Sequence, residues 1–183
     1  PVRAEQAETA TGGNGKAEPV HRLDAGEVLD EIDDLDDGHD ETKRYKSLSH
    51  GPAPVVLGVE GIEAAAKHAI EFVRRWSTAQ GDGAPLSFCV IVSSEKTRDA
   101  MAGLMQAAGL RCIAITAQNN HADARDVVHL ATMHRAKGLE FDCVVVVAPK
   151  SYLGVAEETE TQRKLLYVAL TRAKRGAMML TLG

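Results

Sequence analysis

The amino-acid sequence predicts an α/β fold in which a mostly parallel sheet lies between two layers of helices. The first observation is that several short segments are unbroken apolar runs, among them 88–92 and 143–148. Such runs are typical of strands buried on both faces, as in parallel sheets. The second observation is that segments with the helical spacing of apolar residues separate most of these runs. Parallel neighbours need such crossovers, which we expect to be right-handed.

The elements can be predicted in chain order. A β-rich run at 55–59, between Pro54 and Gly61, predicts the first strand. A helix follows, because seven apolar residues from Ile62 to Trp76 recur at helical spacing and line one face. The other predicted elements are a strand at 87–93, a helix at 100–108, a strand at 111–116, a polar stretch at 117–126, strands at 127–132 and 142–148, a helix at 161–175 and a strand at 177–182.

Acidic side chains are concentrated at the start of the chain. The 183 residues carry a net charge of −5, yet residues 1–50 alone hold 13 acidic and six basic side chains. Within them, 24–41 contains ten acids and no lysine or arginine. This composition predicts a flexible acidic tail or linker at 1–50 and one folded domain at 51–183. An alternative is that the acidic strip mimics DNA against a basic groove.

Composition also narrows the class of protein. A hydrophobic content of 44% predicts a soluble globular domain, whereas 4% aromatic residues disfavours a base-stacking platform. The three cysteines (Cys89, Cys112 and Cys143) lie in apolar runs, so we interpret them as buried structural thiols. Neither they nor the histidines have the spacing of a metal site. Because the sequence has no run of 18 apolar residues and no signal peptide, we expect a cytoplasmic protein.

The first segment with a chemical signature is TMHRAKGLE at 132–140. It predicts a strand that ends at Thr132, a tight turn that contains Gly138, and a buried strand that begins at Asp142. A glycine in such a turn allows a phosphate to approach backbone N–H groups closely. Open α/β sheets bind ligands at the carboxyl ends of their strands, so we expect the polar side chains of this segment to form a site there.

The second segment is QRKLLYVALTRAKR at 162–175, which predicts a helix packed on the sheet. Its predicted apolar face consists of Leu165, Leu166, Val168, Ala169, Leu170 and Ala173. Arg172 would lie beside this face in a late helical turn, held rigidly while its guanidinium projects toward another surface. That placement suits charge stabilisation of a transferring phosphoryl group. We interpret Tyr167 as a core residue, and Lys174 and Arg175 as a solvated helix end favoured by the helix dipole.

These two segments resemble motifs V and VI of the UvrD/Rep/PcrA-type superfamily 1 DNA helicases. Both motifs occur in the expected order, separated by the expected strand and loop. The resemblance covers 132–173, and the strand–helix pattern from Val55 onward is compatible with the same domain. It implies a RecA-like (P-loop NTPase-like) three-layer fold, namely that of the second, C-terminal motor domain, which lacks the Walker A loop. The implied activity is ATP-dependent unwinding of DNA, with 3′ to 5′ translocation.

The resemblance assigns nucleotide contacts to three residues. Arg172 resembles the motif VI arginine that contacts the γ-phosphate of ATP bound on the other motor domain. Gly138 and Glu140 resemble the motif V positions that meet the γ-phosphate and the ribose. The alternatives are an ordinary surface ion pair for Arg172 and a solvated charge for Glu140.

The resemblance assigns nucleic-acid contacts to the beginning of the same motif. Thr132 and His134 resemble motif V positions that contact the backbone of single-stranded DNA. Lys137 is interpreted as a phosphate neighbour or as a support for the turn. The alternative for His134 is a turn histidine with its hydrogen bonds satisfied within the domain.

The sequence also departs from a complete helicase. It contains no GxxxxGK[ST] phosphate loop, and the family's motif IV arginine has no clear equivalent. The resemblance therefore implies that ATP and Mg²⁺ are held mainly by an N-terminal motor domain of a parent chain, and that the isolated fragment is inactive. Two rival classes remain. One is a non-catalytic nucleic-acid- or protein-binding module derived from a helicase, and the other is an interaction domain whose acidic arm docks a basic partner.

Overall fold

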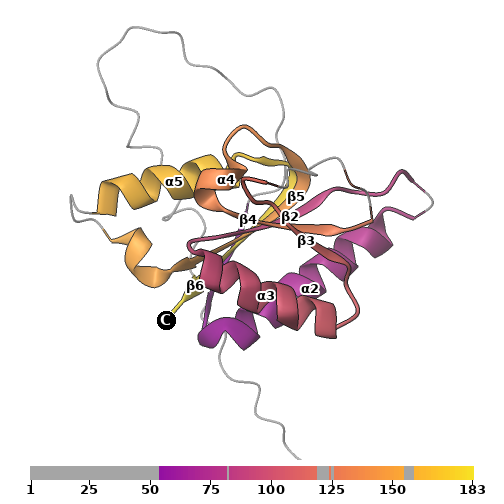
Figure 1. Ribbon diagram of the computed structural model, residues 1–183, viewed down its shortest axis with the longest axis horizontal. Coiled ribbons are helices and arrows are strands. Elements are labelled where there is room, and N and C mark those ends of the chain that lie inside the picture. Colours follow the sequence, from indigo (N-terminus) through magenta and orange to yellow (C-terminus); the bar gives the residue numbers. More distant parts are fainter. Residues whose placement is uncertain (1–53, 82, 119–123, 125, 155–158) are drawn as a thin grey trace, which may run out of the picture.

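The computed structural model describes residues 54–81, 83–118, 124, 126–154 and 159–183 (Figure 1). The predicted acidic tail at 1–50 lies outside the described residues. The helices and strands of the described part are β1 (Val55–Val59), α2 (Gly61–Ala79), β2 (Phe88–Val92), α3 (Glu95–Ala107), β3 (Cys112–Ala114), β4 (Val128–Thr132), α4 (Met133–Ala136), β5 (Phe141–Pro149), the 3-10 turn η2 (Lys150–Leu153), α5 (Glu160–Leu170) and β6 (Ala173–Leu182).

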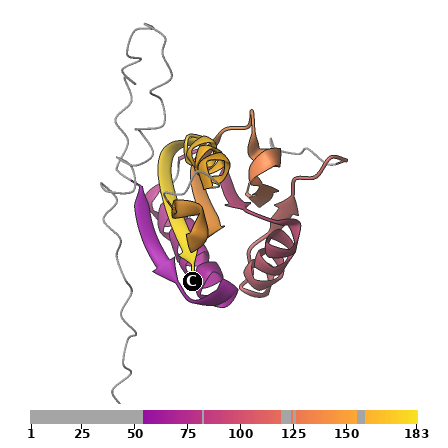
Figure 2. The same ribbon diagram turned by 90° about the vertical axis from the view of Figure 1, so that its left-hand side faces the viewer.

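The six strands form one sheet in the order β1-β6-β5-β2-β4-β3, and all neighbours are parallel. The helices α2 and α3 cover one face of this sheet, and α4 and α5 cover the other (Figures 1 and 2). The predicted α/β class with helices on both faces is therefore confirmed.

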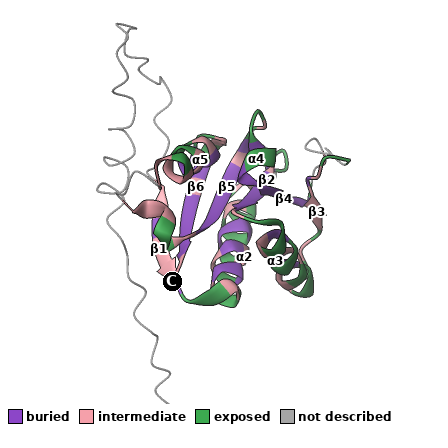
Figure 3. Ribbon diagram, turned by 60° about the vertical axis from the view of Figure 1, so that its left-hand side comes forward, coloured by how far each residue is buried: buried purple, intermediate pink, exposed green. Residues whose placement is uncertain are grey.

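The central strands β2, β4 and β5 are largely buried on both faces (Figure 3). The apolar runs of β2 and β5 predicted this burial, whereas β4 also buries the polar residues His129 and Thr132. Alternate residues of β5 point into different cores. Val145 and Val147 pack with α2 and α3, whereas Val144 and Val146 pack with α4 and α5. This alternation is the period of two that every β-strand imposes on its side chains.

All strands of the parallel sheet start at one end and finish at the other. We call the end at which the strands finish the carboxyl edge, and the end at which they start the amino edge. Thr132, the last residue of β4, pairs with Val92, and Val92 pairs with Val147 near the end of β5. Phe141, the first residue of β5, lies six residues before Val147, or roughly 20 Å away at about 3.3 Å per residue.

The structure changes the start of one predicted helix and adds a short helix that the sequence did not predict. The helix α3 begins five residues earlier than predicted, because Ser94 caps it by accepting a hydrogen bond from the backbone N–H of Thr97 at 3.1 Å. The connection after Thr132 is not only a tight turn, since the four-residue helix α4 follows β4 directly.

The largest correction concerns the second motif. The helix α5 ends at Leu170 and not at 175, so Ala173, Lys174 and Arg175 belong to β6. Ala, Lys and Arg favour helices, but pairing with β5 overrides that weak preference. Specifically, the carbonyl of Arg172 accepts a hydrogen bond from the backbone N–H of Phe141 at 2.9 Å.

The shorter helix also has a different buried face. Its buried residues are Leu166, Ala169 and Leu170. The predicted members Leu165, Val168 and Ala173 are only partly buried. Tyr167 is 48% exposed, so its interpretation as a core residue was wrong.

Candidate functional site

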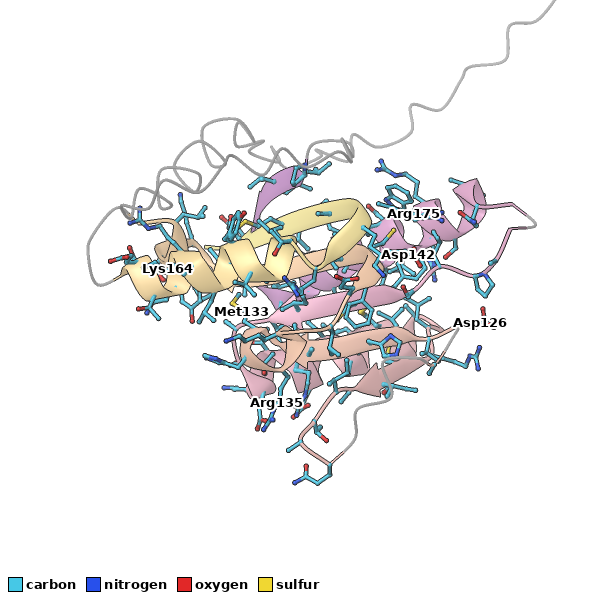
Figure 4. The ribbon with its side chains drawn as sticks, turned by 90° about the horizontal axis from the view of Figure 1, so that it is seen from above. Asp126, Met133, Arg135, Asp142, Lys164 and Arg175 are labelled. Atoms are coloured by element: carbon cyan, nitrogen blue, oxygen red, sulfur yellow. The ribbon has the colours of Figure 1, made fainter. Side chains whose placement is uncertain are left out.

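The candidate residues of the first motif lie at opposite ends of the sheet. Thr132 lies at the carboxyl edge, where the sequence predicted the whole group, but Glu140 directly precedes β5 at the amino edge. Figure 4 shows this division, with Met133 and Arg135 of α4 toward one end and Asp142 and Arg175 toward the other. The prediction of one polar cluster at the carboxyl edge is therefore corrected. The segment spans the sheet and has one candidate group at each end.

The candidate nucleic-acid contacts are one buried residue at the carboxyl edge and two exposed residues that follow it. Thr132 is 9% exposed, and its side chain makes no capping hydrogen bond to α4. His134 in α4 and Lys137 just after it are exposed. Neither forms an ion pair with a carboxylate among the residues that the structure describes. Both side chains are accessible to a ligand.

Gly138 is required by its backbone conformation. Its φ of +85° lies in the left-handed region, and an added Cβ would meet nothing within 4 Å. The constraint is therefore conformational, not spatial. The turn is closed by a hydrogen bond from the N–H of Leu139 to the carbonyl of Ala136 at 3.1 Å. This turn leads the chain from α4 to Glu140 and the start of β5.

Arg172 lies in the turn between α5 and β6 and is partly exposed. Its Nε donates to the carbonyl of Val168 at 3.0 Å, and its Nη2 donates to Oγ1 of Thr171 at 3.3 Å. The last carbonyls of a helix lack partners within the helix and carry partial negative charge, so they favour a cation there. The side chain is thus anchored at its base on the surface of the domain, although it follows the helix and does not lie within it.

Glu140 and Arg172 lie close together at the amino edge, and Lys174 forms an ion pair with Glu140. The ammonium of Lys174 is 3.0 Å from Oε2 of Glu140, and both side chains are more than half exposed. The hydrogen bond and the charge of Lys174, followed by the charge of Arg172, hold the pKa of Glu140 below its ordinary value. Glu140 is therefore a carboxylate that can accept hydrogen bonds at neutral pH.

This pair leads to a prediction about proton binding. The Lys174→Gln variant is expected to raise the pKa of Glu140 toward the ordinary glutamate value, because the first cause of its depression is removed. Since the pKa is lower in the folded state, the stabilising effect of Glu140 is present above its unfolded-state pKa and is lost as the pH falls through the folded value. A carboxylate-detected NMR titration measures the shift.

The chain offers a matched control for this titration. Lys164 forms an equivalent exposed pair with Glu160 and lowers the pKa of Glu160 in the same way. Lys164→Gln should move the titration of Glu160 and leave that of Glu140 unchanged. An unaltered Glu140 titration in Lys174→Gln would contradict the pairing.

The structure adds residues that sequence reasoning did not identify. Lys174 and Arg175 are the first exposed residues of β6, and they face Glu140 and Asp142. Their interpretation as a solvated helix end was wrong. The charge pattern contains a signal for this arrangement, since two carboxylates two residues apart in one motif match two adjacent cations after the other. This charge pattern can be interpreted only when β5 and β6 are known to be neighbouring strands.

Other features of the described residues are structural. Cys89 and Cys143 are buried and Cys112 is half-buried. Burial raises the pKa of all three thiols, that of Cys143 to about 12, so they remain protonated at neutral pH. No group of three or more potential metal ligands occurs in the described ranges. In the same part of the chain, every helix is too short or too polar to cross a membrane.

Comparison with known proteins agrees with the motifs and the fold. Residues 127–180 match the family model of the UvrD-like helicase C-terminal domain. Among solved structures, the chain is similar to the C-terminal domain of a possible DNA helicase from Lactobacillus plantarum WCFS1. The TM-score is 0.62 and the identity 20%, over 85% of this chain and 84% of that chain. No curated protein matches the sequence.

The two comparisons carry different weight. At 20% identity, the structural likeness shows the fold. The family model covers both segments that the sequence analysis singled out, 132–140 and 162–175. The predicted resemblance is thus confirmed over residues 127–180, which match the UvrD-like helicase C-terminal domain.

Proposed function

We propose that this chain is the second motor domain of an ATP-dependent DNA helicase or translocase. In this proposal Arg172 and Glu140 at the amino edge, with Gly138 in the turn that precedes Glu140, contact ATP bound on an N-terminal motor domain of the same parent chain. Thr132 at the carboxyl edge, with His134 and Lys137 after it, contacts single-stranded DNA. One observation carries the proposal: a single segment, 132–140, runs from Thr132 at the carboxyl edge to Glu140, which lies beside Arg172 at the amino edge.

The amino-edge residues fit a bound nucleotide by their chemistry. The partly exposed guanidinium of Arg172 and the exposed ammonium of Lys174 are cations that suit phosphate oxygens. The ionised Glu140 suits the hydroxyl groups of a ribose. The left-handed turn at Gly138 allows close approach to the backbone. Mg²⁺ would be bound mainly by the N-terminal motor domain, where it would neutralise charge on the β- and γ-phosphates.

Arg172 would act when negative charge develops on the transferred phosphoryl group. Its anchoring to the carbonyl of Val168 restrains the side chain before the reaction, so little reorganisation is needed during it. Closure of the proposed cleft between the two motor domains would bring the guanidinium onto the γ-phosphate. Release of phosphate would free the guanidinium.

The same segment provides a route from hydrolysis to movement on DNA. The helix α4 follows Thr132, packs against α5 and ends at the turn that contains Gly138. A displacement of the turn during closure would therefore be passed to α4 and to the DNA-facing residues. Repeated opening and closure would move the domain along the strand, as in other hinge-type domain closures. We propose 3′ to 5′ polarity on the family resemblance.

The half-site character of the proposal is directly testable. The pure 183-residue chain is expected to hydrolyse no measurable ATP, because it contributes an arginine and a turn but no phosphate-binding loop. A coupled phosphate-release assay with Mg²⁺ and single-stranded DNA measures this. The Arg172→Ala chain serves as the control, since contaminating ATPase activity would not respond to the substitution. Robust hydrolysis that disappears in Arg172→Ala would contradict the half-site proposal.

A further inference from the structure

Asp142 makes polar contacts with two neighbouring strands at the amino edge. Its Oδ2 accepts hydrogen bonds from both the backbone N–H and the hydroxyl of Ser87, each at 2.9 Å. Its own N–H donates to the Ser87 hydroxyl, also at 2.9 Å. The other carboxylate oxygen, Oδ1, lies 3.4 Å from Nε of Arg175. Figure 4 shows Asp142 and Arg175 close together at this end of the sheet.

These contacts join the starts of three neighbouring strands. Ser87 directly precedes β2, Asp142 is the second residue of β5, and Arg175 is the third residue of β6. Arg175 also donates from Nη1 to Oε1 of Gln80, at 3.3 Å, just after α2. A single half-buried carboxylate therefore fixes the relative positions of β2, β5 and β6 at the amino edge.

A β-bulge explains how β6 presents adjacent cations to β5. The pairing runs from Phe141 with Ala173 to Cys143 with Gly176, so β6 carries one extra residue in this interval. In a regular strand, neighbouring side chains point to opposite faces. Here the bulge allows adjacent residues, Lys174 and Arg175, to reach Glu140 and Asp142 respectively. Bulges commonly redirect side chains beside functional sites.

The far end of the bulge is held by packing against α2. A Cβ added to Gly176 would come within 2.3 Å of the ring of Trp76, so the indole lies directly on the glycine. With Asp142 on one side and Trp76 on the other, the backbone from Arg172 to Gly176 is restrained at both ends.

We propose that Asp142 is a positioning residue for Arg172 and Glu140. It holds the start of β5, where the N–H of Phe141 donates to the carbonyl of Arg172 at 2.9 Å. Through this bond and the Arg175 contact, Asp142 sets the position of the turn that carries the Arg172 side chain. Glu140 lies two residues before Asp142 and is restrained by the same attachment. The inference rests on the proposed role of Arg172.

The test is a double-mutant cycle in the parent helicase. Asp142→Ala is expected to lower kcat of the DNA-stimulated ATPase by about 10- to 100-fold, since misplacement of a catalytic group by about 1 Å costs about 100-fold. It should also raise KM for ATP, because Glu140 is displaced. In the Arg172→Ala background the same substitution should lower kcat little further, because Asp142 acts through Arg172.

A matched carboxylate controls for general effects. Asp99 on α3 forms an ion pair with Arg98 at 2.9 Å, and its replacement removes a comparable charge away from the amino edge. Asp99→Ala should leave kcat and KM unchanged. If Asp142→Ala is insoluble, Ser87→Ala replaces it, since it removes the hydroxyl's bonds to Asp142 and leaves the backbone bond. It should lower kcat in the same direction by a smaller factor.

The outcomes separate this inference from the proposed function. Normal turnover in Arg172→Ala would contradict the proposed function itself. An inactive Arg172→Ala together with wild-type kcat and KM in Asp142→Ala, or in folded Ser87→Ala if that variant is used, would overturn the positioning role alone. Independent effects of the two substitutions on kcat would also overturn it.

Discussion

Replacing Arg172 with alanine is expected to lower the DNA-stimulated ATPase rate of the parent helicase by about 10³-fold or more. The reason is that the guanidinium is proposed to meet charge that develops on the γ-phosphoryl group only in the transition state. Binding of single-stranded DNA should stay close to wild type, because Thr132 and His134 lie at the opposite edge of the sheet. Steady-state phosphate release and fluorescence anisotropy with a labelled oligonucleotide measure the two quantities.

Two controls make this result specific. Arg75 is an exposed arginine on α2, on the other face of the sheet, so Arg75→Ala removes the same charge without touching the site. Its ATPase rate should be unchanged. Arg172→Lys keeps the charge but loses the planar fork of donors, and it should recover only part of the rate. Normal turnover in Arg172→Ala would contradict the proposed contact of Arg172 with the γ-phosphate.

Replacing Phe141 with alanine is expected to destabilise the folded chain by about 3–5 kcal/mol, the usual cost of removing a fully buried aromatic side chain. Phe141 has 0% exposure, and its ring centroid lies 5.3 Å from that of the buried His129. It packs in the core beneath α4 and α5, between the two motifs. Urea unfolding of the 183-residue chain, followed by circular dichroism, gives the change in the free energy of unfolding.

The exposed aromatic residue of α5 provides the comparison. Tyr167 is 48% exposed, so Tyr167→Ala should cost less than about 1 kcal/mol. Equal destabilisation by the two substitutions would mean that Phe141 is not part of the core. Because the N–H of Phe141 also bonds to Arg172, a folded Phe141→Leu variant is useful for asking whether core packing alone affects the ATPase.

The sequence determined most of the secondary structure, because β2 and most of β5 are unbroken apolar runs. The run at 143–148 predicted a strand buried on both faces, and alternate residues of β5 do fill the two cores. The helix α2 was equally predictable, since seven apolar residues repeat at the helical period, and four of them (Ala65, Ala66, Ala69 and Val73) are buried. The predicted strand at 87–93 contains the observed β2, Phe88–Val92.

The sequence was a poorer guide where two structures compete for the same residues. Ala173 to Arg175 have good helix propensity, which extended the predicted helix past its true end at Leu170. What ends the helix is a backbone hydrogen bond to Phe141, 31 positions earlier in the chain. No periodicity within 162–175 contains that information. Tyr167 is exposed because α5 packs by the face that carries Leu166, Ala169 and Leu170.

By itself, then, the sequence determined the class of fold, the resemblance of residues 132–173 to the UvrD-type helicases and the chemical groups of the candidate site. These features depend on side-chain type and on the spacing of residues that are close together in the sequence. The tertiary structure alone decided that Thr132 and Glu140 lie at opposite edges of the sheet, and that Asp142 joins Ser87 to Arg175. Those arrangements depend on strand order and register, which arise from the packing of segments far apart in the chain.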